Sequence, residues 1–541
     1  MSYPYQAKTE ELYSLYKRCY PTPGIHETYQ YLSSGTNEAE PPLSLSEARA
    51  LLADSITILT TDNGNAPHLS EQVATPLILL IDASAQLNRS ELSNLKNAVY
   101  ETDRYQLWYS DHDYRDADNA AVYPCYKPAW NPGLLRHGNY VGAAVLCQTG
   151  LFIRSGGIHR LAGQSIIYDF LLRCCSLLSR DQIKHIPCML YHLPSSHYQH
   201  PHGFFAQTDD RLALERDVKR NSATQDVIDN GPFPGTFTIR RHLRGNVPSV
   251  NIVIPTKNHR HLLESCVSSV ISVTEYPDFS ITIVDNGSTD SAVVEYLAEL
   301  HKEPCISKID YANDFNFSAI NNLAVNDSEA EVIVLLNDDI EVTQKDWLKN
   351  MVAEAIQPDV ACVGTKLFYA NGLVQHAGVV AGMQGVAGHI NRFATPDDRG
   401  YAGSLAFSSD YSAVTAACLA VRRSVYVELD GLDAIHLAVA YNDVDFCLRA
   451  LEAGYRNRLL ADVHHVHHES VSRGHATDRV QQQRFLSEIA YMKKRHAAVI
   501  EQDPAWNPNF SKRCSSPFVP FHAGYEYEAG RQTPCRSSSS N

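Results

Sequence analysis

The second half of this 541-residue chain alternates short apolar segments with short helical segments, and this alternation constrains the fold most. The apolar segments are rich in Val and Ile, and the helical ones carry apolar residues at spacings of three and four. From Pro248 onward we predict strands at 250–254, 279–284, 306–309 and 332–336, and helices at 261–273, 291–300 and 318–325. Strands that alternate with helices in this way form βαβ units. The sequence therefore predicts an α/β domain with a mostly parallel, Rossmann-like sheet flanked by helices.

Polar residues follow three of these strands at the points where the strands end. They are Pro255–Thr256, Asp285–Asn286 and Asn337–Asp338–Asp339. Ligands of open α/β sheets bind beyond the carboxyl ends of the strands. A turn with a helix cap explains Asp285 and Asn286 equally well. The adjacent Asp338 and Asp339 are harder to explain structurally, because two carboxylates at a buried strand end repel each other and lose hydration. A bound Mn²⁺ or Mg²⁺ would relieve both effects.

Two motifs farther along the chain leave their roles open. Asp443 falls in the first turn of a predicted helix, where the helix dipole favours a carboxylate, so spacing alone indicates a structural acid. Four of the five residues 464–468 are histidines. An imidazole near carboxylates can bind a metal, but a solvated strand edge explains these histidines as well. The chain contains no GxxxxGK[ST] motif, which argues against a P-loop nucleotidase.

Composition narrows the class of protein. The formal net charge of −15 argues against nucleic-acid binding, which calls for a basic face. The 13 cysteines include no CxxC pair, so neither a zinc ribbon nor a disulfide framework is indicated. We find no secretory pattern and no apolar run long enough to span a bilayer. We therefore expect a cytoplasmic protein, with peripheral association at the inner face of a membrane left open.

The order of these motifs resembles that of the GT-A-fold, family 2 glycosyltransferases, especially the bacterial rhamnosyltransferase-like members that build surface polysaccharides such as O-antigen. The matching segments are 253–256, 283–288, 315–322, 335–342, 374–379, 415–423, 442–447 and 467–470. The resemblance implies an inverting, metal-dependent enzyme that moves a sugar from a nucleotide-diphosphate donor to a glycan or lipid-linked acceptor. Rhamnose is one candidate sugar.

The resemblance also implies roles for individual residues. The donor-binding residues would be Pro255, Thr256, Asp285, Asn286, Asn316, Asn337 and Asp338. Asp339 and His467, with His468 as the alternative, would bind Mn²⁺ or Mg²⁺, which neutralises the departing diphosphate. Asp443 would act as the general base that takes the proton from the acceptor hydroxyl.

The region before the linker resembles a second, degenerate copy of the same domain. Only Asp82 remains where an acidic pair is expected, and Ala83 and Ser84 follow it; Ile167 stands where the base is expected. The predicted division is an N-terminal extension at 1–65, a degenerate GT-A-like domain at 66–220, a linker at 221–246, a catalytic domain at 247–500 and a partly disordered tail at 501–541. We interpret the degenerate copy as retained for packing, acceptor binding or assembly.

Two alternative functions are compatible with parts of this pattern. A non-catalytic protein that binds a glycan or a nucleotide sugar, or serves as a scaffold, stays open, although the Asp339, Asp443 and His467 set favours an enzyme. A sugar nucleotidyltransferase is disfavoured because the segment after the first strand is not rich in glycine. The sequence specifies neither the donor sugar, the acceptor and linkage nor the oligomeric state.

Overall fold

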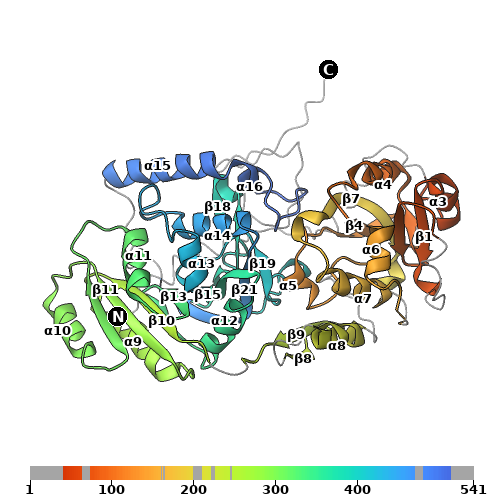
Figure 1. Ribbon diagram of the computed structural model, residues 1–541. Coiled ribbons are helices and arrows are strands. Elements are labelled where there is room, and N and C mark those ends of the chain that lie inside the picture. Colours follow the sequence, from red (N-terminus) through yellow and green to blue (C-terminus); the bar gives the residue numbers. More distant parts are fainter. Residues whose placement is uncertain are drawn as a thin grey trace, which may run out of the picture.

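The computed structural model describes residues 41–63, 73–159, 161, 165–198, 210–220, 226–243, 247–468 and 479–512. Within these ranges the chain forms two halves, each built on its own sheet, lying side by side (Figure 1). Residues 513–541 of the predicted tail at 501–541 lie outside the described ranges, as do residues 1–40 of the predicted extension.

The second half is built on a ten-stranded sheet in the order β12-β11-β10-β13-β20-β15-β21-β14. This order names eight of the ten strands. The other two lie beside it, since β16 pairs with β15 and β19 pairs with β21. The strands are β10 (Val250–Thr256), β11 (Phe279–Asp285), β12 (Ile306–Asp310), β13 (Val332–Leu336), β14 (Ile340–Glu341), β15 (Val360–Phe368), β16 (Val374–His376), β19 (Ser409–Tyr411), β20 (Cys418–Arg422) and β21 (Arg456–His467).

The predicted α/β fold class is confirmed. One part of the sheet, called here the parallel block, has only parallel pairings, and the rest of the sheet combines parallel and antiparallel pairings. Strands β12, β11, β10 and β13 pair in parallel, whereas β20 runs antiparallel to both β13 and β15. All seven residues of β10 are buried, as expected for a strand covered on both faces. The helices of this half are α9 (Arg260–Val273), α10 (Ser291–Leu300), α11 (Phe317–Asp327), α12 (Trp347–Ala355), α13 (Arg423–Glu428) and α14 (Asn442–Glu452).

The first half is built on a seven-stranded sheet in the order β1-β2-β6-β4-β7-β3, with β5 paired to β4. The strands are β1 (Ile56–Thr60), β2 (Leu77–Ile81), β3 (Gln86–Leu87), β4 (Leu107–Arg115), β5 (Ala121–Cys125), β6 (Ala144–Gln148) and β7 (Ile183–Pro194). The sheet thus begins ahead of the predicted boundary at residue 66. Its main helices are α3 (Leu45–Leu52), α4 (Leu92–Asn97), α6 (Thr149–Arg154) and α7 (Ser165–Cys174).

The two sheets repeat one topology. The order β1-β2-β6-β4-β7-β3 matches β10-β13-β20-β15-β21-β14, and β5 matches β16. Every matched pairing also has the same direction, for example parallel for β4 with β7 and for β15 with β21. The second half adds β11 and β12 outside β10 and β19 beside β21, and the described part of the first sheet has no counterpart of these three strands.

Segments between and after the halves fold against them. Within the predicted linker, β8 (Val227–Asn230) and β9 (Phe237–Arg240) form a hairpin whose Phe237 is buried in the core of the first half. Helices α15 (Arg479–Arg495) and α16 (Ala497–Glu501) follow β21, and the chain then returns to the first half. There the Asn507 amide donates to the Asp111 carboxylate at 2.9 Å.

A buried polar junction joins the halves. Asp410 of β19 pairs with Arg456 at 2.8 Å and accepts a hydrogen bond from the Gly133 backbone amide at 3.2 Å. A Cβ atom at Gly133 would lie 1.6 Å from an Arg458 nitrogen, so a larger residue there would displace the ends of the Arg458 and Asp410 side chains. The halves therefore depend on each other for the burial of these charges.

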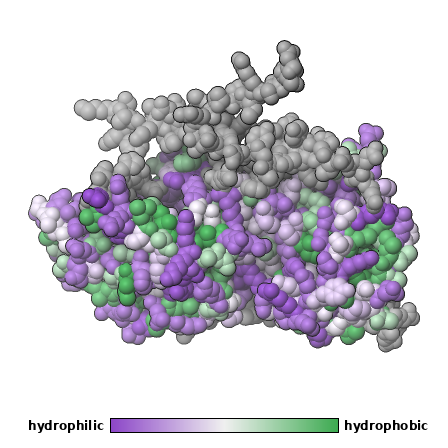
Figure 2. Space-filling model, turned by 90° about the horizontal axis from the view of Figure 1, so that it is seen from above, coloured by the Kyte–Doolittle hydropathy of each residue, from purple (hydrophilic) through white to green (hydrophobic). Residues whose placement is uncertain are grey.

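The described surface seen in Figure 2 is largely hydrophilic, with apolar residues in scattered groups. Among the described residues, every helix is too short or too polar to cross a bilayer.

Candidate active site

The carboxyl ends of β10, β11 and β13 bring three predicted donor-binding residues together. Thr256 pairs with Asp285 in the register of β10 and β11, and its hydroxyl donates to Asp338 Oδ2 at 2.7 Å. Asp285 Oδ1 accepts from the Ser288 amide at 2.9 Å, which orders the turn after β11. Pro255 is buried within β10. The parallel block thus forms the predicted cluster at one edge of the sheet.

Two predicted donor-binding residues hold loops in this structure. The Asn286 amide donates to the carbonyls of Tyr311 and Asn313 at 3.1 and 2.9 Å. The Asn316 side chain caps α11 by accepting from the Ala319 amide at 2.9 Å, and it also donates to the Ala434 carbonyl at 2.9 Å. Their contact with a donor therefore stays a prediction.

The acidic pair at the end of β13 is buried. Asp338 is 8% and Asp339 4% exposed, and Asn337 is fixed by its backbone amide, which donates to the Ala417 carbonyl at 3.0 Å. Burial raises the pKa of Asp338 to about 7, and the charge of Asp339 acts in the same direction against the Thr256 hydrogen bond. A nearby positive charge would stabilise the ionised form of these two carboxylates.

His467 supplies the partner for Asp339. The β14–β21 register places His467 opposite Ile340, and His467 Nε2 lies 3.0 Å from Asp339 Oδ1. Two adjacent ligands of an octahedral cation, each about 2.1 Å from it, lie about 3.0 Å apart. Asp339 and His467 therefore fit a shared Mn²⁺ or Mg²⁺. His468 is directed elsewhere, since its Nε2 contacts Glu341 Oε2 at 2.9 Å.

Two protein ligands leave room for a substrate. No group of three or more His, Cys, Asp or Glu side chains suited to a metal gathers in the part of the chain that the structure describes. Mg²⁺-type cations in phosphate-transfer sites are commonly held by one or two carboxylates plus substrate phosphates and water. An Asp339–His467 pair is consistent with a cation completed by a diphosphate.

Asp443 lies in the first turn of α14, half-buried and fixed by backbone amides. Its Oδ2 accepts from the Ala416 amide at 3.0 Å, and its Oδ1 accepts from the Val444 amide at 2.8 Å. Ala416 adjoins Ala417, whose carbonyl holds Asn337. One short segment thus links the carboxylate of Asp443 to the acidic strand end.

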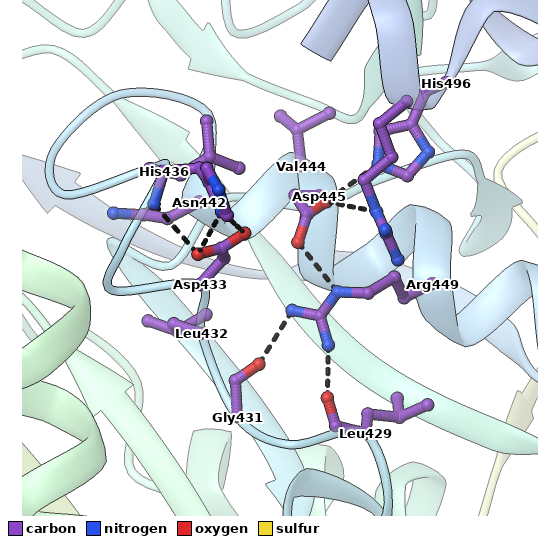
Figure 3. Close-up of polar contacts among 12 residues, drawn as sticks. Leu429, Gly431, Leu432, Asp433, His436, Asn442, Val444, Asp445, Arg449 and His496 are labelled. Atoms are coloured by element: carbon purple, nitrogen blue, oxygen red, sulfur yellow. Dashed lines mark hydrogen bonds and ion pairs between the residues drawn. The ribbon is translucent and has the colours of Figure 1, made fainter. Parts of the chain in front are cut away.

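A buried network supports the helix that carries Asp443 (Figure 3). Arg449 donates through Nε to Asp445 Oδ2 at 2.7 Å, and through its other nitrogens to the carbonyls of Leu429 and Gly431. His496 Nε2 contacts Asp445 Oδ1 at 2.8 Å. Burial raises the pKa of Asp445, but the hydrogen bonds from His496 and Arg449 outweigh it and hold the pKa below its usual range.

The first half has the same network without an acidic residue at the position of Asp443. Arg173 donates through Nε to Asp169 Oδ2 at 2.8 Å and through its other nitrogens to the carbonyls of Ser155 and Gly157. This is the pattern of Arg449 and Asp445, four residues apart on α7 as on α14. The residue two positions before the aspartate is Ile167 in α7 and Asp443 in α14.

The strand end of the first half carries a single carboxylate, Asp82. The Asp82 amide donates to the Ala143 carbonyl at 2.8 Å, as the Asn337 amide does to Ala417 at 3.0 Å. Asp82 therefore corresponds to Asn337, and Ala83 and Ser84 correspond to Asp338 and Asp339. The described part of the first half offers neither the acidic pair nor the base at these positions.

Sequence reasoning missed Gln375 and Arg449 as parts of the site. Gln375 Oε1 contacts His467 Nδ1 at 2.8 Å from a residue 92 positions away in the chain. The signal available was a polar residue inside the matched segment 374–379. Arg449 was visible only as a helix residue four positions after Asp445.

Comparison with known proteins gives this site its context. Residues 251–425 match the family model Glycosyl transferase family 2. The chain is 36% identical over 414 residues to the uncharacterized protein y4gI of Sinorhizobium fredii, covering 75% of this chain and 45% of that protein. It is 32% identical over 441 residues to the O-antigen biosynthesis protein RfbC of Myxococcus xanthus, covering 80% and 33%.

A shorter relative has a more specific name. The chain is 30% identical over 224 residues to the O-antigen chain rhamnosyltransferase RfbN of Salmonella typhimurium, covering 40% of this chain and 66% of that protein. The chain thus spans less than half the length of y4gI and RfbC. Among solved structures, the mannosyltransferase PcManGT of Pyrobaculum calidifontis matches with a TM-score of 0.34 and 18% identity over 52% of this chain and 71% of that one.

Proposed function

We propose that this chain, which belongs to the family 2 glycosyltransferases through residues 251–425, is an inverting, divalent-metal-dependent transferase. It moves a sugar from a nucleotide-diphosphate donor to a glycan or lipid-linked acceptor in bacterial surface polysaccharide synthesis. The observation that carries the proposal is the contact of Asp339 with His467 at 3.0 Å, at the sheet edge linked through residues 416–417 to Asp443. Rhamnose is the first sugar to test, because one relative is named as a rhamnosyltransferase.

In this mechanism each side chain has one task. Thr256 and Asp285 bind the nucleoside end of the donor at the ends of β10 and β11. Asp339 and His467 would hold the cation, and Mn²⁺ or Mg²⁺ would supply positive charge against the departing diphosphate. Asp443, oriented by the amides of Ala416 and Val444, accepts the proton from the acceptor hydroxyl. The hydroxyl oxygen attacks the anomeric carbon from the face opposite the diphosphate, which inverts the configuration there.

We further propose that the first half is a non-catalytic copy of the same domain. The shared strand order supports a common architecture, and Ala83, Ser84 and Ile167 stand where the second half has two carboxylates and a base. An isoleucine cannot accept a proton. The first half then serves to bury its side of the junction and to shape the acceptor side of the molecule.

The test uses the full chain. Release of nucleoside diphosphate is measured for a panel of nucleotide sugars with Mn²⁺, with and without EDTA, for the wild type and for Asp443→Asn. We expect turnover that EDTA abolishes and a loss of about 10²–10⁴-fold in kcat for Asp443→Asn. A metal-independent rate, or an Asp443→Asn variant with wild-type kcat, contradicts the mechanism.

The alternative function is a non-catalytic glycan- or nucleotide-sugar-binding protein. It predicts that a nucleotide sugar raises the apparent thermal stability while no donor is turned over. We place the transferase in the cytoplasm, with peripheral contact to the inner face of the membrane when its acceptor is lipid-linked. Co-sedimentation with vesicles that contain the acceptor would test this placement.

A further inference from the structure

Gln375 occupies an irregular position in the sheet. Strand β16 pairs antiparallel with β15, with Leu367 opposite His376 and Phe368 opposite Val374. Leu367 and Phe368 are adjacent in β15, but their partners in β16 are two residues apart. Gln375, which lies between those partners, is therefore the extra residue of a β-bulge. Bulges beside active sites re-aim a side chain that regular pairing would turn away.

The bulge directs the Gln375 side chain at His467. The amide oxygen lies 2.8 Å from His467 Nδ1, and both side chains are buried. An amide oxygen is only an acceptor, so Nδ1 carries the proton and donates. With the Nδ1 proton donated to Gln375, Nε2 is the ring nitrogen that faces Asp339 Oδ1, 3.0 Å away. A ring nitrogen and a carboxylate oxygen at this separation can both ligate one bound cation.

Neighbouring backbone holds the bulge in place. The Phe393 amide donates to the Val374 carbonyl at 2.7 Å, and the Val374 amide donates to the Ala394 carbonyl at 2.9 Å. Phe393 adopts a φ of +69°, a left-handed conformation that is unfavourable for an aromatic residue. A strained loop that fixes one strand next to the site is typical of a functional constraint.

We propose that Gln375 is a positioning residue, which fixes the tautomer and ring plane of His467 so that Nε2 faces a cation shared with Asp339. The inference rests on the proposed function, because the cation is part of that mechanism. Groups that hydrogen-bond the other ring nitrogen of a ligating histidine typically contribute about 10–100-fold to metal affinity or activity. Packing alone would require only a side chain of similar volume at position 375.

The test measures Mn²⁺ binding to the full chain, with Mn²⁺ alone, by the loss of the free-ion EPR signal. Gln375→Met keeps the volume and removes the acceptor, and we expect its Kd to rise about 10–100-fold. Gln375→Glu keeps an acceptor oxygen and should bind within a few-fold of the wild type. His467→Ala should raise the Kd at least as much as Gln375→Met, with weak binding to Asp339 still measurable. Gln375→Met/His467→Ala should bind no worse than His467→Ala, because the two residues act through one ligand.

Gln344→Met is the matched control. Gln344 also bonds to β21, but through backbone groups: its amide donates to the Asp462 carbonyl at 3.0 Å and its oxygen accepts from the His464 amide at 2.7 Å. We expect an unchanged Kd for Mn²⁺ in this variant. Thermal unfolding without Mn²⁺ reports folding for every variant.

The outcomes separate the two proposals. Wild-type binding by Gln375→Met, equal weakening by Gln344→Met, or additive losses in the double variant each overturn the role of Gln375. Wild-type Mn²⁺ binding by His467→Ala overturns the metal assignment in the proposed function, and the role of Gln375 with it. If Gln375→Met fails to fold, a weakened Gln375→Glu overturns the positioning role and a normal one supports it.

Discussion

Replacing Arg449 by lysine tests whether the buried network under α14 serves catalysis. The guanidinium of Arg449 bonds Asp445 and the carbonyls of Leu429 and Gly431 at the same time, as Figure 3 shows. A lysine keeps the positive charge but has a single ammonium group instead of a planar fork. It can replace the contact with Asp445 only by giving up the two carbonyls.

The expected magnitude follows from these contacts. Hydrogen bonds to charged groups contribute about 1.5–3 kcal/mol each, so the loss of two predicts a decrease in the free energy of unfolding of about 3 kcal/mol or more. The carbonyls belong to the segment that leads into α14, so their release shifts the helix start and Asp443. A displacement of about 1 Å in a catalytic group can cost about 10²-fold, and we expect kcat to fall about 10–100-fold.

The chain provides its own control. Arg173→Lys removes the same contacts, to the carbonyls of Ser155 and Gly157, from a helix that carries Ile167 in place of the base. Urea unfolding should show similar losses for the two variants, whereas nucleoside diphosphate release at saturating donor and acceptor should fall only for Arg449→Lys. An equal fall in kcat for Arg173→Lys, or an unchanged kcat for Arg449→Lys, refutes the reasoning.

Three further predictions concern charge and burial. Burial lowers the pKa of Lys127 to about 8, so the folded state releases this proton before the unfolded state does and stability rises from pH 8 towards about 10.5; Lys127→Met should lack this rise when urea midpoints at pH 7.5 and 9.5 are compared with the wild type. Asp410→Asn should lower the free energy of unfolding by about 3 kcal/mol because it weakens a buried pair with Arg456, and an unchanged urea midpoint would contradict this. Ile167→Asp in an Asp443→Asn background should give no diphosphate release, and any restored turnover would show that the first half retains a working site.

The parallel block could be predicted because local sequence determines it. The helix at 291–300 and the strand at 332–336 were predicted with the bounds that the structure shows, and β10 extends only two residues beyond its predicted end. The mixed part of the sheet was not predicted. Strands such as β14 and β16 have two and three residues, too few for a periodic pattern, and their partners lie far along the chain.

The site could be predicted in part for the same reason. Residues that end neighbouring parallel strands must meet, which brought Thr256, Asp285 and Asp338 together in the structure. The contact between Asp339 and His467 depends on the antiparallel pairing of β14 with β21, so the residues alone left His467 and His468 equivalent. The role of Gln375 depends on a bulge, and a bulge is a property of two paired strands rather than of one sequence segment.

The two halves together separate what the fold requires from what the chemistry requires. Both keep the strand order, the direction of each pairing and an aspartate–arginine pair that ties one helix to two loop carbonyls. Because the first half keeps this pair without a base, the pair is needed for the fold, and its effect on catalysis in the second half must act through Asp443. In the first half the base position is filled by Ile167, which is fully buried in the apolar core. At such a position an apolar side chain contributes packing, whereas an unpaired carboxylate would cost stability. Substitutions at the positions where the two halves differ therefore test the proposed mechanism most directly.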